Sequence, residues 1–148
     1  MNNVCNSLLA WMELTEAKAR YCRFLDTKDW QAFGELMTED FELDLSGTSS
    51  QGVFNGRDAA LQTIRASIET AKTAHQVHNP EITLNEQGNE AEVIWAMQDR
   101  VVWPENGQSL TGYGHYHERW RKENGAWKLA AQCLTRLHME LTHQQEVV

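Results

Sequence analysis

The feature of this chain that most constrains its fold is a set of four long segments with strand-like patterning, which fill the second half of the sequence. They span about 74–85, 90–103, 108–122 and 126–140. Three turn-forming tripeptides separate them: Gln87-Gly88-Asn89, Glu105-Asn106-Gly107 and Glu123-Asn124-Gly125. Because Asn and Gly tolerate positive φ, such tripeptides favour tight hairpin turns. The pattern predicts a meander of long antiparallel strands.

The first half of the chain is helical instead. Apolar residues at helical spacings predict a helix over about 6–25, a short helix after Thr27 or Asp29 as its cap, and a third helix after Asn55-Gly56. A short strand is predicted between the second and third helices, around 41–45. One change from helical to strand periodicity favours an α+β fold. We expect three helices on a long, strongly curved sheet, forming a cone with a cavity at its wide end.

Pro80 lies within the first of the long strands. Proline cannot donate to a strand ladder, so an edge strand or a bulge is expected there. A bulge would also explain why the apolar face changes phase between Val77 and Ile82.

Composition limits the class of protein. With 148 residues we expect a single domain over 1–148, with its core at about 10–140. Thirteen Lys and Arg against 21 Asp and Glu give a net charge of −8, which disfavours nucleic acid and anionic membrane surfaces as partners.

Several segments bear on location and redox state. No apolar run approaches 20 residues, and the N-terminus lacks the basic region of a secretory signal, so a cytoplasmic protein is expected. Three cysteines without CxxC spacing indicate thiols rather than disulfides or a zinc site. The last six residues, HQQEVV, are expected to form a loose tail.

Asp26 and His75 are the leading candidates for chemistry. An aspartate behind a histidine fixes the imidazole tautomer and stabilises the imidazolium, which is how a general base is built. Asp26 also falls near the predicted C-terminus of a helix, where the helix dipole disfavours an anion. His75 and His78 point to opposite faces of their strand, so one of them can line a given cavity, and a structural histidine bonded to a backbone carbonyl is the alternative.

Asp99 interrupts an otherwise apolar strand face. Its row contains Val93, Trp95, Met97 and Val101. A buried carboxylate needs a partner, and Arg136 and Tyr21 are the candidates. Asp99 would then act either as an acid toward a leaving hydroxyl or as half of an internal salt bridge.

Other residues are candidates for a binding site. Tyr113, His115 and His117 alternate onto one strand face, where a two-histidine iron site is an alternative to a metal-free site. Trp30, Phe33 and Phe54 are expected to line the cavity, since they lie near the helices that should cap its open end. Trp95, Trp120 and Trp127 are expected in the core. Gly112 and Gly114 predict a close backbone approach or a bend.

The order of several motifs resembles a SnoaL-like domain of the nuclear-transport-factor-2-like superfamily. The motifs are YCRFLDTKDWQAF, FNGRDA, HQVHNPEI, VIWAMQDR, GYGHYHERW and GAWKLAAQCLTRL. The resemblance covers about residues 10 to 140 and implies the cone-shaped, cystatin-like α+β fold.

Within that superfamily the chain is most similar to bile-acid 7α-dehydratase, scytalone dehydratase and hexachlorocyclohexane dehydrochlorinase. The resemblance implies that Asp26 and His75 form a catalytic dyad, that Tyr21 hydrogen-bonds a substrate oxygen, and that Asp99 and Arg136 complete the polar end of the cavity. It also makes His115 a candidate second catalytic histidine, with Tyr113 beside it. The implied reaction is a cofactor-independent, metal-free elimination.

We therefore expect a lyase or isomerase that acts on a small hydrophobic, cyclic substrate. The alternatives are a noncatalytic ligand-binding or assembly module and a polyketide-cyclase-like or ketosteroid-isomerase-like enzyme. A cavity of about 300 to 1,000 Å³ would accommodate a ring system. Apolar residues on the outer sheet face, Ile94, Ala96 and Val102, predict a homodimer or homotrimer.

Overall fold

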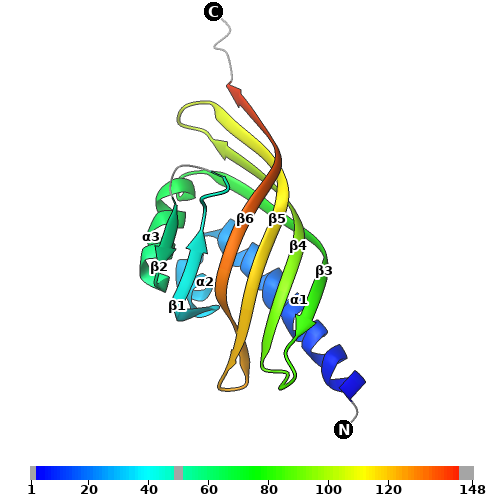
Figure 1. Ribbon diagram of the computed structural model, residues 1–148. Coiled ribbons are helices and arrows are strands. Elements are labelled where there is room, and N and C mark those ends of the chain that lie inside the picture. The colour runs from blue at the N-terminus through cyan, green and yellow to red at the C-terminus, as the bar shows by residue number, and fades with distance from the viewer. Residues whose placement is uncertain (1–2, 49–51, 144–148) are drawn as a thin grey trace, which may run out of the picture.

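Residues 3–48 and 52–143 of the chain form three helices and a six-stranded sheet, which confirms the α+β prediction (Figure 1). The computed structural model describes residues 3–48 and 52–143. The elements are α1 (Asn3–Thr27), α2 (Trp30–Glu35), β1 (Met37–Asp44), β2 (Val53–Asn55), α3 (Arg57–Ile68), β3 (Lys72–Leu84), β4 (Glu90–Trp103), β5 (Gln108–Glu123) and β6 (Ala126–His143). Of the predicted C-terminal tail, all but His143 lies outside the described residues.

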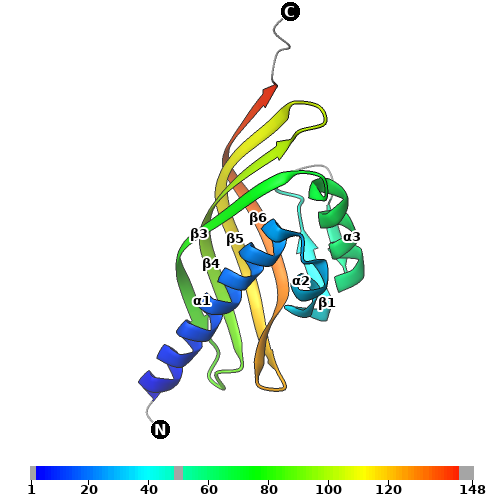
Figure 2. The same ribbon diagram turned by 180° about the vertical axis from the view of Figure 1, so that it is seen from behind.

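The sheet order is β2-β1-β6-β5-β4-β3. Strands β3 to β6 form the predicted antiparallel meander, and β1 joins β6 in parallel. Helix α1 lies diagonally across one face of the long strands, while α2 and α3 lie beside β1 (Figure 2). Strand β3 is an edge strand, and the C-terminus of α1 lies next to it, so two segments distant in sequence meet there.

Local sequence explains most element boundaries. The Asp29 side chain accepts a hydrogen bond from the Ala32 amide and caps α2, as predicted. Asn124 and Gly125 both adopt positive φ in the β5–β6 turn. Strand β2 was not predicted, because three residues are too few to show a periodicity.

An edge strand or a bulge was expected at Pro80, and the structure has both. It lies on the edge strand β3, and the register with β4 shifts between Val77 and Pro80. Val77 before the shift and Ile82 after it both pack against the core, so the bulge reconciles the change of apolar phase.

The core lies between α1 and the inner face of the sheet. Trp95, Trp120 and Trp127 are all buried, as predicted. Helix α1 contributes a stripe that contains Leu14, Lys18, Tyr21 and Leu25, all fully or nearly buried.

A charged cluster is buried within this core. The Glu118 cluster consists of Lys18, Trp95, Glu118, Trp120 and Gln132. Lys18 Nζ lies 2.5 Å from Glu118 Oε1, and both side chains are 0% exposed. The ammonium also lies 3.6 Å from the ring centroid of Tyr21 and 4.0 Å from that of Tyr116, a favourable cation–π geometry.

Gly112 and Gly114 allow the close approaches that the sequence predicted. A β-carbon on Gly112 would collide with the Arg136 guanidinium and the Asp99 carboxylate. A β-carbon on Gly114 would collide with the Thr135 carbonyl, next to an irregularity in the β5–β6 register. The two glycines therefore make room for Arg136 to cross the inner face of the sheet.

We expect Gly112→Ala to lower the free energy of unfolding by about 1 to 3 kcal/mol, because the added methyl group must displace a buried ion pair. Urea unfolding followed by circular dichroism measures the change. The control is Gly34→Ala, whose β-carbon would meet only the flexible end of the Leu61 side chain, at 2.9 Å. Equal losses in the two variants would contradict the prediction.

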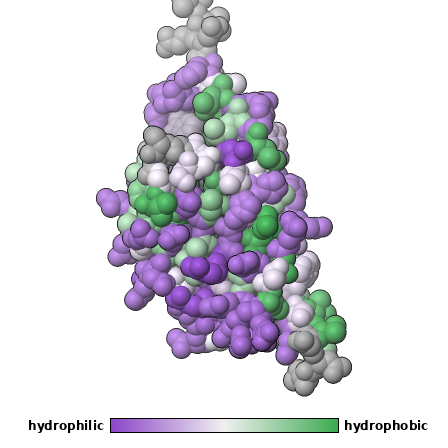
Figure 3. All heavy atoms as spheres, in the orientation of Figure 1, coloured by the Kyte–Doolittle hydropathy of each residue, from purple (hydrophilic) through white to green (hydrophobic). Residues whose placement is uncertain are grey.

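The outer face of the sheet carries mixed side chains. Figure 3 shows this face, with hydrophobic residues in separate small patches between hydrophilic ones. Ile94, Ala96 and Val102 are half-buried there within the single chain. Coverage of this face by a second subunit stays a prediction. Within residues 3–48 and 52–143, no helix has both the length and the apolar character needed to cross a membrane.

Candidate functional site

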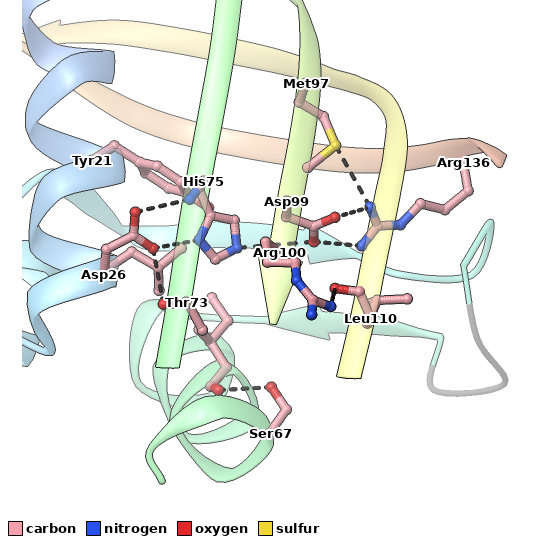
Figure 4. A network of polar contacts seen from close by, with 12 residues as sticks. Tyr21, Asp26, Ser67, Thr73, His75, Met97, Asp99, Arg100, Leu110 and Arg136 are labelled. Atoms are coloured by element: carbon pink, nitrogen blue, oxygen red, sulfur yellow. Dashed lines mark hydrogen bonds and ion pairs between the residues drawn. The ribbon is translucent and has the colours of Figure 1, made fainter. Parts of the chain in front are cut away.

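Asp26 and His75 meet as the sequence predicted. Asp26 Oδ1 lies 2.7 Å from His75 Nδ1, and Asp26 Oδ2 accepts a hydrogen bond from the His75 backbone amide at 2.8 Å. Figure 4 shows the aspartate at the end of α1 reaching the histidine on β3. An ionised carboxylate only accepts, so Nδ1 carries a proton, and in the neutral ring the lone pair is then on Nε2. The ring is thus prepared to take a proton at Nε2.

The position of His75 on an edge strand makes this double contact available. Strand β3 pairs only with β4, so the amides on its other side have no strand partner. Asp26 uses one carboxylate oxygen for such an amide and the other for the ring. One side chain therefore fixes both the backbone and the imidazole of His75.

Two residues that the sequence analysis missed support Asp26. The Thr73 hydroxyl donates to Asp26 Oδ1 at 2.9 Å and accepts from Lys28 Nζ at 2.8 Å. Lys28 follows α1 with φ of 61°, a conformation that normally favours Gly or Asn. Burial lowers the pKa of the Lys28 ammonium, and the Asp26 charge opposes that change. These contacts compensate for placing an anion at a helix C-terminus.

The pKa of Asp26 reflects these contacts. Burial raises the pKa, but hydrogen bonds from the ring and amide of His75, the charge of His75 and the hydrogen bond from Thr73 outweigh burial and lower the pKa overall. The folded state therefore favours the ionised carboxylate.

We expect Asp26 to stabilise the fold above about pH 4, the ordinary pKa of aspartate, and to lose that effect as pH falls through its lower folded-state pKa. The sign follows because the unfolded chain binds the proton more readily than the folded chain. In urea unfolding between about pH 3 and 6, the wild type should converge on Asp26→Asn as pH falls. The control is Glu86→Gln, which removes an exposed carboxyl between β3 and β4. A constant difference between wild type and Asp26→Asn would contradict the prediction.

Asp99 and Arg136 form the other side of the site. Arg136 Nη1 and Nη2 donate to Asp99 Oδ1 and Oδ2 at 2.6 and 2.8 Å, a bidentate pair. His75 Nε2 lies 4.0 Å from Asp99 Oδ2. Arg136 is thus the partner that Asp99 was predicted to need, and the geometry favours the internal salt bridge over the acid role.

A cavity of about 220 Å³ opens beside His75, Asp99 and Arg136. Most of its lining is apolar, from Leu25, Leu43, Leu45, Ile64, Ile68, Val101, Trp103, Leu110, Tyr116 and Leu134. Tyr21, Thr48, Ser67 and Gln132 add polar groups. The volume is below the expected range of about 300 to 1,000 Å³, which suits one ring or a small bicycle rather than a larger ring system.

The five residues predicted to bind substrate do not line this cavity. Phe33 is 0% exposed and packs on the Tyr21 ring, with Trp30 edge-on to it, because α2 fills the space beneath α1. Phe54 packs partly buried against the core. Tyr113 and His115 project from the outer face of β5, because the inner face carries the alternate residues.

The remaining histidines lie apart from the dyad. His78 is exposed on β3, so the structure favours His75 as the histidine facing the cavity. His117 bonds Thr135 on the outer face, with its ring centroid 6.2 Å from that of His115. Across the described part of the chain, no group of three or more His, Cys, Asp or Glu side chains is arranged to hold a metal ion.

Gln132 in the cavity lining and its hydrogen-bond partner Glu118 had a signal in the sequence that was not used. Glu118 stands in an inward row with Tyr116 and Trp120, as Asp99 does in its own row. Gln132 faces Glu118 across β5 and β6. A charged or amide residue within an apolar strand row would therefore have identified both residues as candidates for the site.

Comparisons with known proteins confirm the family resemblance. A model described as a SnoaL-like domain matches residues 6–131. The probable cyclase FGR4 of Gibberella zeae is 27% identical over 143 residues, covering 84% of this chain and 89% of that protein.

Solved structures show the same fold. A protein of Novosphingobium aromaticivorans DSM 12444, provisionally named scytalone dehydratase, has a TM-score of 0.84 and 21% identity over 96% of this chain and 93% of its own. The hexachlorocyclohexane dehydrochlorinase LinA type 3 of Novosphingobium barchaimii LL02 has a TM-score of 0.81 and 14% identity, with 99% of each chain covered.

Proposed function

Since the chain belongs to the SnoaL-like domain family, we propose that it is a cofactor-independent lyase or isomerase in which His75 removes a proton from a substrate carbon. The observation that carries this proposal is the Asp26–His75 contact, which engages Nδ1 of a histidine that lines the cavity, with Nε2 4.0 Å from Asp99 Oδ2. The names of relatives, a cyclase, a dehydratase and a dehydrochlorinase, support an enzyme.

The favoured reaction is dehydration. His75 Nε2 takes a proton from a carbon with an acidic C–H bond, and Asp26 stabilises the imidazolium that forms. The C–H electron pair becomes the new double bond while the bond to a hydroxyl on the neighbouring carbon breaks. The imidazolium returns its proton to that hydroxyl, so water leaves and His75 is restored.

The cavity indicates the substrate class. Its lining is mainly apolar, which favours a small hydrophobic ring, and His75, Asp99 and Arg136 lie next to one another within it. The Arg136 guanidinium adds a positive charge there, which would stabilise negative charge on a substrate oxygen.

Cyclisation is the second candidate, because the Gibberella zeae relative is named a probable cyclase. Ring closure can begin with the same proton removal, and it differs in where the resulting electron pair goes. Noncatalytic binding would need the cavity but not the hydrogen bond between Asp26 and the His75 ring.

The test uses cyclic β-hydroxy ketones of one or two rings in D₂O, without added metal or cofactor. We expect deuterium to appear at the acidic carbon and water to be lost, and both processes should be slower in Asp26→Asn, which keeps the base but loses tautomer control. Neither exchange nor elimination across the panel would contradict the dehydratase proposal. Exchange followed by a new carbon–carbon bond would favour the cyclase.

A further inference from the structure

The Tyr21 hydroxyl stands at the end of a hydrogen-bond chain that starts at Glu118. The Glu118 carboxylate accepts hydrogen bonds from Lys18 Nζ at 2.5 Å, Trp95 Nε1 at 2.9 Å and Trp120 Nε1 at 2.8 Å. Ammonium and indole groups can only donate. Glu118 is therefore a carboxylate that only accepts.

Gln132 connects Glu118 to Tyr21, and only one orientation of its amide fits. Gln132 Nε2 donates to Glu118 Oε1 at 2.7 Å, and Gln132 Oε1 lies 3.0 Å from Tyr21 Oη. The flipped amide would place a carbonyl oxygen against the carboxylate, which leaves two buried acceptors without a proton between them. Tyr21 must therefore donate its proton to Gln132.

With that proton committed, Tyr21 Oη can offer the cavity only a lone pair. Burial and the nearby Glu118 charge raise the pKa of Tyr21, so the hydroxyl keeps its proton. In the neutral form of His75, Nε2 also presents a lone pair, because Nδ1 donates to Asp26. Asp99 adds carboxylate oxygens to the lining, and Arg136 is the charged donor beside them. Each terminal nitrogen of Arg136 donates to Asp99, so this guanidinium is directed at Asp99 rather than at Tyr21.

Two further hydroxyls at the cavity already donate their protons to backbone carbonyls. Thr48 Oγ1 donates to the Leu45 carbonyl at 3.1 Å, and Ser67 Oγ donates to the Ile64 carbonyl at 2.8 Å. Tyr116 also lines the cavity, but within residues 3–48 and 52–143 its hydroxyl makes no hydrogen bond like that of Tyr21 to Gln132. Both tyrosines are buried, at 2% and 4% exposed, but only Tyr21 donates its proton to Gln132.

We propose that Tyr21 acts as a hydrogen-bond acceptor toward the ligand, and that the cavity selects a substrate that places a hydroxyl group, rather than a carbonyl, against Tyr21. This inference rests on the proposed function, because it assigns the alcohol of the substrate to that end of the site. It also gives a direction to the hydrogen bond between Tyr21 and a substrate oxygen that the family resemblance implied.

The test compares binding of 1-indanol and 1-indanone, which share a bicyclic skeleton and differ in their ability to donate. We expect the alcohol to bind about five- to tenfold more tightly to the wild type in calorimetric or NMR titration, the effect of roughly one hydrogen bond. In Tyr21→Phe this preference should fall toward a ratio of one. In Tyr116→Phe, which removes a hydroxyl of equal burial from the same cavity, it should persist.

Gln132→Met tests the direction of the hydrogen bond. Methionine has a similar volume but offers Tyr21 no strong acceptor, so the phenolic proton becomes free to point into the cavity. We expect the ketone to bind more tightly to this variant than to the wild type. If the variant does not fold, the comparison between Tyr21→Phe and Tyr116→Phe still decides the question.

The outcomes separate this inference from the proposed function. A preference for the ketone in the wild type, a ratio near one, or no binding of either compound at millimolar concentration would overturn it. An alcohol preference that persists in Tyr21→Phe would overturn it as well. If the protein prefers the alcohol but catalyses no deuterium exchange, the result would support the acceptor role of Tyr21 and contradict the dehydratase proposal.

Discussion

Replacement of Lys18 by methionine is expected to lower the free energy of unfolding by about 3 to 5 kcal/mol, because it leaves the Glu118 carboxylate buried without its counter-ion. Three neutral donors, from Trp95, Trp120 and Gln132, remain on Glu118. They cannot neutralise a full charge in a region with no exposure. Urea unfolding at neutral pH measures the loss.

Two comparisons make this first prediction specific. The double variant Lys18→Met/Glu118→Gln removes both charges and should regain much of the lost stability, since the cost arises from the unpaired ion. Arg20→Met on the same helix breaks an exposed i,i+4 pair with Glu16 and should cost less than about 0.5 kcal/mol. A loss below about 1 kcal/mol in Lys18→Met would contradict the assigned role of the pair.

His75→Gln is expected to reduce turnover by about 10² to 10⁴-fold while the protein stays folded. The glutamine side chain has no basic nitrogen, so it cannot take a proton from carbon. Folding should persist, because the carboxylate of Asp26 still accepts from the backbone amide of residue 75 and from Thr73. The measurement is the steady-state rate of water loss, with circular dichroism as a check on folding.

His78→Gln is the matched control for this second prediction. His78 lies three residues away on the same strand but is exposed. Its replacement should leave the rate unchanged. Full activity in a folded His75→Gln protein would contradict the assignment of His75 as the base, whichever of the two reactions the enzyme catalyses.

The features that sequence predicted well are those fixed by local rules. The turn at Asn124-Gly125, the cap at Asp29 and the bulge near Pro80 each follow from the backbone preferences of one or two residues. The meeting of Asp26 and His75 depends on a long-range contact instead. It was predictable because an anion at a helix C-terminus and the family motif order pointed to the same pair.

The incorrect assignments to the cavity concern residues whose burial depends on which face of a strand or helix packs against the core. Tyr113 and His115 carry functional groups, but strand parity alone does not say which row turns inward. The inner row of β5 instead holds Gly112 and Gly114, whose small size leaves room for Arg136. Phe33 was assigned to the cavity because it lies near the helices expected to cap the open end, yet packing against Tyr21 buries it completely.

The buried lysine illustrates the same difficulty in the helix. Lys18 occupies the apolar stripe of α1, but lysine is almost never fully buried without a partner, so pattern reasoning assigns it to solvent. The partner, Glu118, is one hundred residues later. Only the folded arrangement brings the two charges together.

The double contact of Asp26 with His75 also links the activity of the protein to its solubility. An unprotected outer strand can recruit strands from other molecules and so promote aggregation. Asp26 occupies one amide on that open side of β3 with the same carboxylate that orients the imidazole. If β3 detaches from α1, His75 therefore loses its orientation as a base, and an unpaired strand edge that can promote aggregation becomes exposed. Loss of activity and loss of solubility would then occur together.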